Sequence, residues 1–377
     1  MRMESAVAMA TACLALGCTD RHDRAGVPQR GAGHVDQIQL IEAGGGARFD
    51  ALGRSLSGGQ ALTPVAGYNQ FWFAWSVFNH GSAIFGGGTV ATAPLEGDGE
   101  CAVPCEQIRA GCPGKDCIPA LTAPSQVSPG QAGSAYITEG SWVVGVAIGG
   151  EARAYPHNIL WWHEIVNDVV GGVPIAVTHC PLTFSTLGHD PTGFVAGQTV
   201  ELGVSGKLFN SNLVFYNRTD DTYFSQLLGV GTKGAALGDQ APRAHVFEMS
   251  WGAWRRMHPN TTLLSDQTGH ARDYERYPYG DYFVDDADTF APTTPPPDGR
   301  YPNKTLTYGV RLDGEAKAYP YPELARFAEQ IRGASAPPVG LVMDDVGGHR
   351  IAVVFDLDAG YVQAFDRTGL PDLELSL

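Results

Sequence analysis

Hydrophobic and polar positions alternate in two stretches that closely resemble each other, 145–156 and 309–320. The second lies 164 positions after the first, and eight of the twelve positions are identical. Each stretch divides at Gly149-Gly150 or Asp313-Gly314, pairs that tolerate the positive φ of a two-residue turn, so we predict two β-hairpins. A proline ends each stretch and precedes a run with helical apolar spacing, which predicts a helix after each hairpin.

The similarity between the two regions continues beyond the hairpins. Ile175-Ala176-Val177 matches Ile351-Ala352-Val353, which predicts another strand in each region. A Trp-x-x-Trp spacing at Trp72 recurs at Trp251, so residues 36–88 are expected to complete the second region. We expect an α+β fold with a mostly antiparallel sheet, formed by two pseudo-repeated hairpin-helix-strand units that share a core. The repeats are placed at about 140–265 and 305–377.

The first eighteen residues have the pattern of an export signal, with Arg2, an apolar run and a polar stretch after Cys18. The ending Ala15-Leu16-Gly17-Cys18 is similar to a bacterial lipobox, in which Cys18 carries the lipid. We expect an exported protein, either lipid-anchored in the cell envelope or periplasmic or extracellular. A retained anchor helix is disfavoured because the apolar run is shorter than the ~20 residues that span a bilayer.

The rest of the chain is expected to form one globular unit. Residues 19–35 are interpreted as a tether and 36–377 as the globular part. Within that part, 88–141 is a loop-rich segment that holds a cysteine cluster, and 291–303 is a proline-rich connector.

Four cysteines lie close together in the loop-rich segment: Cys101, Cys105, Cys112 and Cys117. In an oxidising compartment they are expected to form two disulfides, with three connectivities open. The alternative is a four-thiolate zinc site, but the spacing lacks the C-x2-C pairs of common zinc sites. Cys180 is then left with a free thiol.

The net charge narrows the choice of partners. The chain has 40 acidic and 25 basic residues and a formal charge of −15. A nucleic-acid backbone or an anionic membrane surface would be repelled, so we expect neither as a partner. The expected partner is a small molecule or a metal ion, with membrane contact only through an N-terminal lipid anchor.

Two histidines of the first region correspond to phenylalanines of the second. His163 corresponds to Phe327 and His179 to Phe355. His163 also lies four residues after Ile159, on the apolar stripe expected for its helix. Both histidines are therefore predicted to point into the protein interior.

Buried imidazoles need polar partners, because burying a polar group without a hydrogen bond costs a few kcal/mol. His163, His179 and Cys180 could bind copper or zinc. Alternatively, a histidine could lower the pKa of Cys180 and create a reactive thiolate for redox or acyl-transfer chemistry. A third interpretation is a non-catalytic envelope binding or structural module with a hydrogen-bonded polar core. The candidate catalytic residues are Cys180, His179 and His163, with Glu164 as a supporting carboxylate.

A polar segment without a counterpart in the second region contains further candidates. Ser205, Lys207 and Asn210 are candidate cofactor-binding residues, and a simple polar turn is the alternative. The segment lacks the upstream glycine and the Ser or Thr of a phosphate-binding loop, which excludes a nucleotide site. The other histidines considered have no motif around them and are expected to be solvated: His157, His189, His245 and His270.

Several stretches resemble a bacterial family called domain of unknown function 3179. They are Lys115–Leu121, Leu160–Asp168, Gly171–Pro174, Thr178–Leu182, Gly203–Leu208, Tyr279–Tyr282 and Gly314–Pro320. The resemblance covers most of residues 110–368 and implies no established activity. The family usually has Cys-Pro-Leu-Cys where this chain has Cys180-Pro181-Leu182-Thr183, so the second thiol of a two-thiol redox mechanism is missing here.

Overall fold

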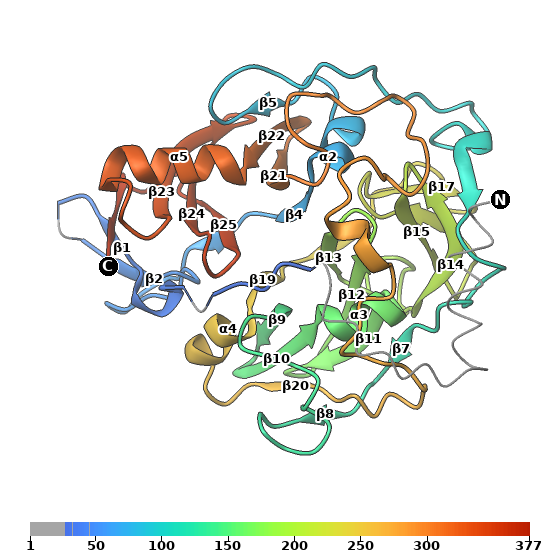
Figure 1. Ribbon diagram of the computed structural model, residues 1–377, viewed down its shortest axis with the longest axis horizontal. Coiled ribbons are helices and arrows are strands. Elements are labelled where there is room, and N and C mark those ends of the chain that lie inside the picture. The colour runs from blue at the N-terminus through green and yellow to red at the C-terminus, as the bar shows by residue number, and fades with distance from the viewer. Residues whose placement is uncertain (1–26, 32, 45) are drawn as a thin grey trace.

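The computed structural model describes residues 27–31, 33–44 and 46–377 (Figure 1). Strands account for 37% of the chain and helices for 12%, so the protein is mostly β. The predicted α+β fold of hairpin-helix-strand units is therefore wrong. The predicted export signal and Cys18 lie outside the described residues.

The helices are shorter than the apolar spacing suggested. The described chain has four α-helices and three 3-10 turns: α2 (Trp72–Phe78), α3 (His157–His163), α4 (Trp251–Met257), α5 (Tyr321–Arg332), η1 (Val35–Gln37), η2 (Cys105–Gln107) and η3 (Gly280–Phe283). Helix α3 ends where Glu164 adopts a φ of 57°. The β-branched Ile165 and Val166 that follow favour an extended chain, so Val166 belongs to a strand and not to the predicted helical stripe.

Three sheets contain the middle of the chain. The first has the order β19 (Phe247–Ser250), β9 (Trp142–Ile148), β10 (Glu151–Pro156), β20 (Thr262–Leu264) and β8 (Gln126–Val127). The second is β18 (Arg243–Ala244), β13 (Ser185–His189), β12 (Val173–Cys180), β11 (Ile165–Val170) and β7 (Leu121–Thr122). The third is β17 (Val230–Lys233), β16 (Tyr223–Ser225), β15 (Asn212–Asn217), β14 (Leu202–Phe209) and β6 (Ile108–Ala110).

The remaining sheets join the two ends of the described chain. One contains β4 (Gly67–Phe71), β21 (Leu306–Leu312), β22 (Glu315–Pro320) and β5 (Ala83–Ile84), and another β23 (Val339–Val346), β24 (His349–Asp356), β25 (Tyr361–Asp366) and β3 (Thr63–Pro64). The smallest consists of β2 (Arg48–Asp50), β1 (Gln39–Glu42) and β26 (Leu373–Ser376), where the blue and red ends of Figure 1 meet.

The sheets built on the β9-β10 and β21-β22 hairpins each contain the same kind of contact between a tryptophan and a glycine. Trp254 of α4 covers Gly145, and Trp75 of α2 covers Gly309, so closely that neither glycine has room for a Cβ atom. The indole N–H of Trp254 donates to Thr261 at 2.9 Å, and that of Trp75 donates to Ser82 at 3.0 Å. A buried indole thus fixes a short helix on each sheet.

Two large apolar cores lie on opposite sides of the β11-β12-β13 sheet. Ile175 and Val177 of β12 belong to one core, whereas Ala176 and Cys180 belong to the other. This follows from the pleat, which directs successive side chains to opposite faces. Residues from both the middle and the C-terminal part of the chain contribute to each core.

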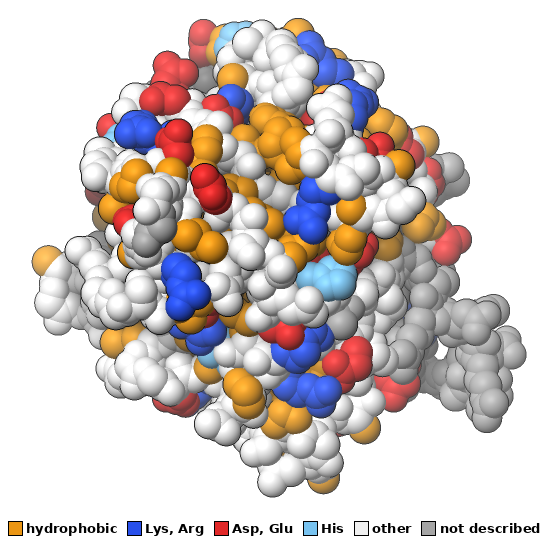
Figure 2. All heavy atoms as spheres, turned by 90° about the vertical axis from the view of Figure 1, so that its left-hand side faces the viewer, with side chains coloured by type: hydrophobic (Ala, Val, Ile, Leu, Met, Phe, Trp, Pro, Cys, Tyr) orange, Lys and Arg blue, Asp and Glu red, His pale blue; other side chains and the backbone are white. Residues whose placement is uncertain are grey.

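The end of the predicted tether packs against the folded domain. Val35 is completely buried, and the Arg30 guanidinium lies 5.2 Å from the centroid of the Trp142 ring and 5.6 Å from that of Tyr321. Residues 27–31 and 33–35 are therefore part of the domain surface. Within the described ranges, no helix has the length and apolar character needed to cross a bilayer. Figure 2 shows one face of the molecule, on which acidic, basic and hydrophobic side chains are interspersed.

We predict that Gly145→Ala and Gly309→Ala each destabilise the protein by about 1–3 kcal/mol, because the added methyl group overpacks against an indole. Urea denaturation measures this change. Gly299→Ala is the control, since nothing lies within 4 Å of its Cβ position. Equal stability of the three variants would contradict the role of the tryptophan contacts.

Candidate functional site

The polar residues of interest surround the end of strand β12. His179 and Cys180 are consecutive and lie on opposite faces of the strand. Both are buried, as are His163 and Glu164. The structure does not bring His163, His179 and Cys180 together: each has its own set of partners.

His163 has both ring nitrogens occupied. Nδ1 lies 2.7 Å from the carbonyl oxygen of Pro119, and Nε2 lies 2.7 Å from the hydroxyl of Tyr274. Burial is the main reason that its pKa is lowered to about 4. His163 is therefore a neutral, hydrogen-bonded core residue that joins α3 to two loops.

His179 lies beside a histidine that the sequence analysis placed in solvent. The ring centroids of His179 and His157 are 4.3 Å apart, and both side chains are fully buried. Nδ1 of His179 lies 2.8 Å from the Thr186 hydroxyl on the paired strand β13. The expectation that His157 is solvated was wrong, and so was that for His189, which is also fully buried.

A carboxylate completes this imidazole cluster, which comprises His157, His179, Thr186 and Glu248. Oε1 of Glu248 lies 2.8 Å from Nε2 of His157, although the two atoms are not aligned for a hydrogen bond. The Thr186 hydroxyl donates to Glu248 Oε1 at 3.1 Å. Thr186 thus connects the carboxylate to His179.

The cluster is linked to the sheet that contains β4. The Asn69 side-chain amide donates to Glu248 Oε2 at 2.9 Å, and the Tyr321 hydroxyl donates to Asn69 Oδ1 at 3.0 Å. Tyr321 is the first residue of α5, as His157 is the first residue of α3. In the region of α5, a neutral phenol and the neutral amide of Asn69 therefore take the places that His157 and Glu248 hold in the region of α3. Of these two pairs, only His157 and Glu248 can hold a transferable proton at neutral pH.

Burial keeps the imidazoles uncharged. It lowers the pKa of His157 to about 3 and raises the pKa of Glu248 to about 8. The pKa of His179 lies well below its usual value because of burial and the neighbouring His157. At neutral pH both rings therefore have an unprotonated nitrogen.

The tautomer of His179 follows from its neighbours. When Thr186 donates its proton to the Glu248 carboxylate, its oxygen can accept the Nδ1–H of His179. Nε2 of His179 then has a lone pair but no hydrogen-bond partner, and His157 Nδ1 also has none. These two buried nitrogens are unsatisfied within the described structure, as is Nε2 of His157 by hydrogen-bond geometry.

Cys180 and Glu164 do come together, on the other face of β12. The Cys180 thiol faces the carbonyl oxygen of Ser211 at 3.6 Å. The pKa of Cys180 is raised to about 11, mainly by burial and, second, by the nearby Glu164 carboxyl. This environment opposes a thiolate, so the structure does not support Cys180 as an activated nucleophile.

Glu164 has an unusual environment. Its carboxyl is buried, and desolvation raises its pKa to about 8. The pKa of the nearby Tyr279 hydroxyl is raised mainly by burial and, second, by the Glu164 carboxyl. Glu164 is thus largely protonated at neutral pH, and its carboxyl influences the pKa of both the Cys180 thiol and the Tyr279 phenol.

A fully satisfied hydrogen-bond network lies next to Cys180. Asn212 donates to Thr183 at 3.0 Å and to Gln226 at 2.8 Å, and Ser185 donates to Gln226 at 2.7 Å. All members are completely buried: Thr178, Thr183, Ser185, His189, Asn212 and Gln226. Thr183 therefore has a structural role, because its hydroxyl ties the turn after β12 to this network.

The three candidate cofactor-binding residues do not form one site. The Ser205 hydroxyl donates to the carbonyl oxygen of Val214. The Asn210 side chain donates to the carbonyl oxygen of Thr294 and accepts from its N–H. Lys207 lines a cavity, and neither Ser205 nor Asn210 is among the other residues of that cavity wall.

The two predicted disulfides are confirmed and join Cys101 to Cys105 and Cys112 to Cys117. Asp98 lies beside the first disulfide, and these three residues are the one group within the described ranges whose side chains could hold a metal ion together. The disulfide uses both sulfurs, so this group does not bind a metal while it is oxidised. Among the cysteines that the structure describes, Cys180 is left as a free, buried thiol.

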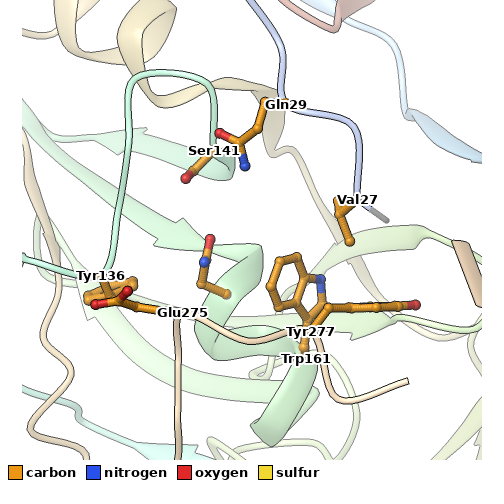
Figure 3. Close-up of a pocket in the computed structure, with 8 residues that line it drawn as sticks. Val27, Gln29, Tyr136, Ser141, Trp161, Glu275 and Tyr277 are labelled. Carbon is orange, nitrogen blue, oxygen red and sulfur yellow. The ribbon is translucent and has the colours of Figure 1, made fainter. Parts of the chain in front are cut away.

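A small pocket lies over helix α3 (Figure 3). Its volume of about 20 Å³ is enough for a water molecule but not for a substrate. Gln29 and Ser141 lie on one side, opposite Trp161 and Tyr277, as Figure 3 shows. The pocket is therefore a small gap where residues 27–31 pack over α3. It is too small to be a ligand site.

His157 and Glu248 were missed because the comparison of the two regions considered only histidines that replace phenylalanine. His157 corresponds instead to Tyr321, each directly after the proline of its hairpin. Glu248 corresponds to Asn69, each three residues before the first tryptophan of the Trp-x-x-Trp spacing. Both signals were present in the sequence as polar differences between aligned positions.

We predict that Glu164→Gln makes stability less dependent on pH. A carboxyl whose pKa is raised from 4.5 to about 8 stabilises the fold fully below pH 4.5, and this stabilisation is lost as the pH rises to about 8. Each pKa unit corresponds to about 1.4 kcal/mol. Between pH 6.5 and 8.5 the melting temperature of the parent should fall more steeply than that of the variant.

The exposed Glu329, on α5, provides the control for this experiment, and Glu329→Gln should leave the pH profile unchanged. The buried histidines contribute equally to the parent and to Glu164→Gln, so their effect cancels when the two slopes are compared. Equal slopes for the parent and Glu164→Gln would show that Glu164 ionises normally.

Comparison with known proteins gives a family but no activity. A family model described as a protein of unknown function, DUF3179, matches residues 115–369. No curated protein and no solved structure matches the chain. The matched range contains His157, His179, Cys180 and Glu248 and confirms the resemblance inferred from sequence. Since it covers more than half of the 377 residues, the chain belongs to the DUF3179 family.

Proposed function

We propose that this protein binds one copper(I) ion between His157 and His179. The observation that carries the proposal is the pair of buried ring nitrogens without partners, on rings whose centroids are 4.3 Å apart. Leaving such groups unsatisfied costs roughly 1–3 kcal/mol each. A metal ion that accepts both lone pairs removes this cost.

The outer ring nitrogens support the same assignment. Histidines that bind metals usually direct their other N–H toward a carboxylate or another acceptor. Here Nδ1 of His179 faces Thr186 at 2.8 Å, and Nε2 of His157 lies 2.8 Å from Glu248. Metal binding would favour the ionised form of Glu248 and would therefore release a proton.

Copper(I) fits this site better than zinc. Zinc in structural sites takes four ligands, and the His157–His179 pair belongs to no group of three metal-binding side chains within the described ranges. Copper(I) can be held by two neutral nitrogen donors in a near-linear arrangement, so binding requires the two rings to move apart from their centroid separation of 4.3 Å. The enclosure by Trp142 and Phe184, which stack on or contact His157, excludes the water that would compete for the ion.

The proposal replaces His163 and Cys180 of the sequence-based metal site with His157 and retains His179. It also retains an exported location, which the two disulfides support because such bonds persist outside reducing compartments. No catalytic step is proposed, since no described cavity reaches the histidine pair. The competing proposal is a non-catalytic module with a buried polar core, which the satisfied network around Asn212 favours.

We expect the purified mature protein to bind one copper(I) ion in competition with a chromophoric copper(I) chelator. His179→Phe and His157→Tyr, which introduce the residues found at the corresponding positions 355 and 321, should weaken binding at least tenfold. His163→Phe is the matched control and should bind as tightly as the parent, because both nitrogens of His163 have protein partners.

Circular dichroism would show that each variant folds, and Thr186→Val would test the outer contact, with an expected loss of roughly 10–100-fold. Absence of copper binding by the parent, or equal binding by the parent and His179→Phe, would leave the structural module as the function. Binding of zinc but not copper(I) would contradict the two-ligand geometry.

A further inference from the structure

A cavity of about 230 Å³ opens on the β17-β16-β15-β14-β6 sheet, at the right of Figure 1. It shares no lining residue with the imidazole cluster. Its walls are Lys207 of β14, Tyr223 of β16, Lys233 of β17, Ile108 of β6 and the disulfide between Cys101 and Cys105. The cavity therefore combines two ammonium groups with apolar walls.

The two lysines are available to a ligand. Lys207 is exposed and makes no ion pair within the described ranges. Lys233 pairs with Glu100 at 2.7 Å, but the two side chains are 54% and 72% exposed. Such a pair contributes little in water and can exchange one carboxylate for another.

Positive charge at this place is unexpected from composition. The chain has a formal charge of −15, yet a third ammonium group, that of Lys115, lies 5.2 Å from the centroid of the Tyr223 ring. Lys115 is paired with Asp221 at 2.6 Å. It therefore adds positive charge beside the Tyr223 ring but is not counted among the groups that would contact a ligand. Tyr223 presents an aromatic surface between positively charged neighbours.

The Asp98 carboxylate beside the disulfide is held by backbone N–H groups. Asp98 accepts N–H groups of Cys101 at 2.9 Å and of Cys105 at 2.7 Å. These bonds lower the pKa of Asp98, the bond from Cys105 most strongly. Asp98 and the disulfide together fix the loop that forms one wall of the cavity.

We propose that this cavity binds a small organic anion, with Lys207 and Lys233 contacting its carboxylate or phosphate groups and Tyr223 its carbon skeleton. The volume is below the ~300–1,000 Å³ of sites for drug-sized ligands, which selects a compact molecule. Two lysines at one cavity match two carboxylates or one doubly charged phosphate. The proposal does not depend on metal binding by His157 and His179.

Isothermal titration calorimetry of the mature protein with succinate, and separately with glycerol 3-phosphate, tests this site. We expect the parent to bind at least one of them, and Lys207→Ala combined with Lys233→Ala to weaken that binding at least tenfold. Arg332→Ala, which removes a partly exposed positive charge at the end of α5, is the control and should bind as the parent does.

The two ligands distinguish the classes of anion. Binding of succinate alone identifies a carboxylate site, and binding of glycerol 3-phosphate alone identifies a phosphate site; both results support the proposal. Lack of binding of either anion to the parent, or equal affinities of the parent and the double lysine variant, would overturn it. Added sodium chloride should weaken binding in the parent, because the contacts are exposed ion pairs.

Discussion

The alternation of side chains along β12 determines where the polar chemistry of this protein lies. His179 and Cys180 are neighbours in the chain, but a pleated strand directs their side chains to opposite faces of its sheet. The imidazole consequently meets Thr186 and His157, and the thiol meets the Ser211 carbonyl and Glu164. Sulfur and imidazole nitrogen cannot act on one ligand while this strand remains in its sheet.

The two faces of that sheet solve the burial of polar groups in different ways. On the thiol face, Asn212 and Gln226 form enough hydrogen bonds to satisfy a dense set of hydroxyls and amides. On the imidazole face, ring nitrogens remain without partners. Because most buried polar atoms in native proteins are satisfied, these ring nitrogens point to a missing partner on the imidazole face.

Short-range features could be predicted from the sequence, because the residues that determine them are adjacent. The turns at Gly149-Gly150 and Asp313-Gly314 have positive φ and close hairpins. Helix lengths could not be predicted, because the positive φ of Glu164 and the strand pairing of Ile165 with Thr178 override the apolar spacing. The fold class was wrong for this reason.

The candidate site was only partly predictable. Replacement of a core phenylalanine correctly indicated that His163 and His179 are buried. It could not indicate that Pro119 and Tyr274 occupy His163, because those partners are distant in sequence. Likewise, the contact of His157 with Glu248 spans residues far apart in the chain, which tertiary packing alone brings together.

The hydrogen bond between Asn69 and Glu248 connects strands β4 and β19, which belong to different sheets. Mutations at these two positions are therefore not independent. An aspartate at 69 would place two carboxylates in contact and would be tolerated only after the acid at 248 had been lost. The evolutionary history of the two sheets should accordingly show paired substitution, with one amide always facing one acid.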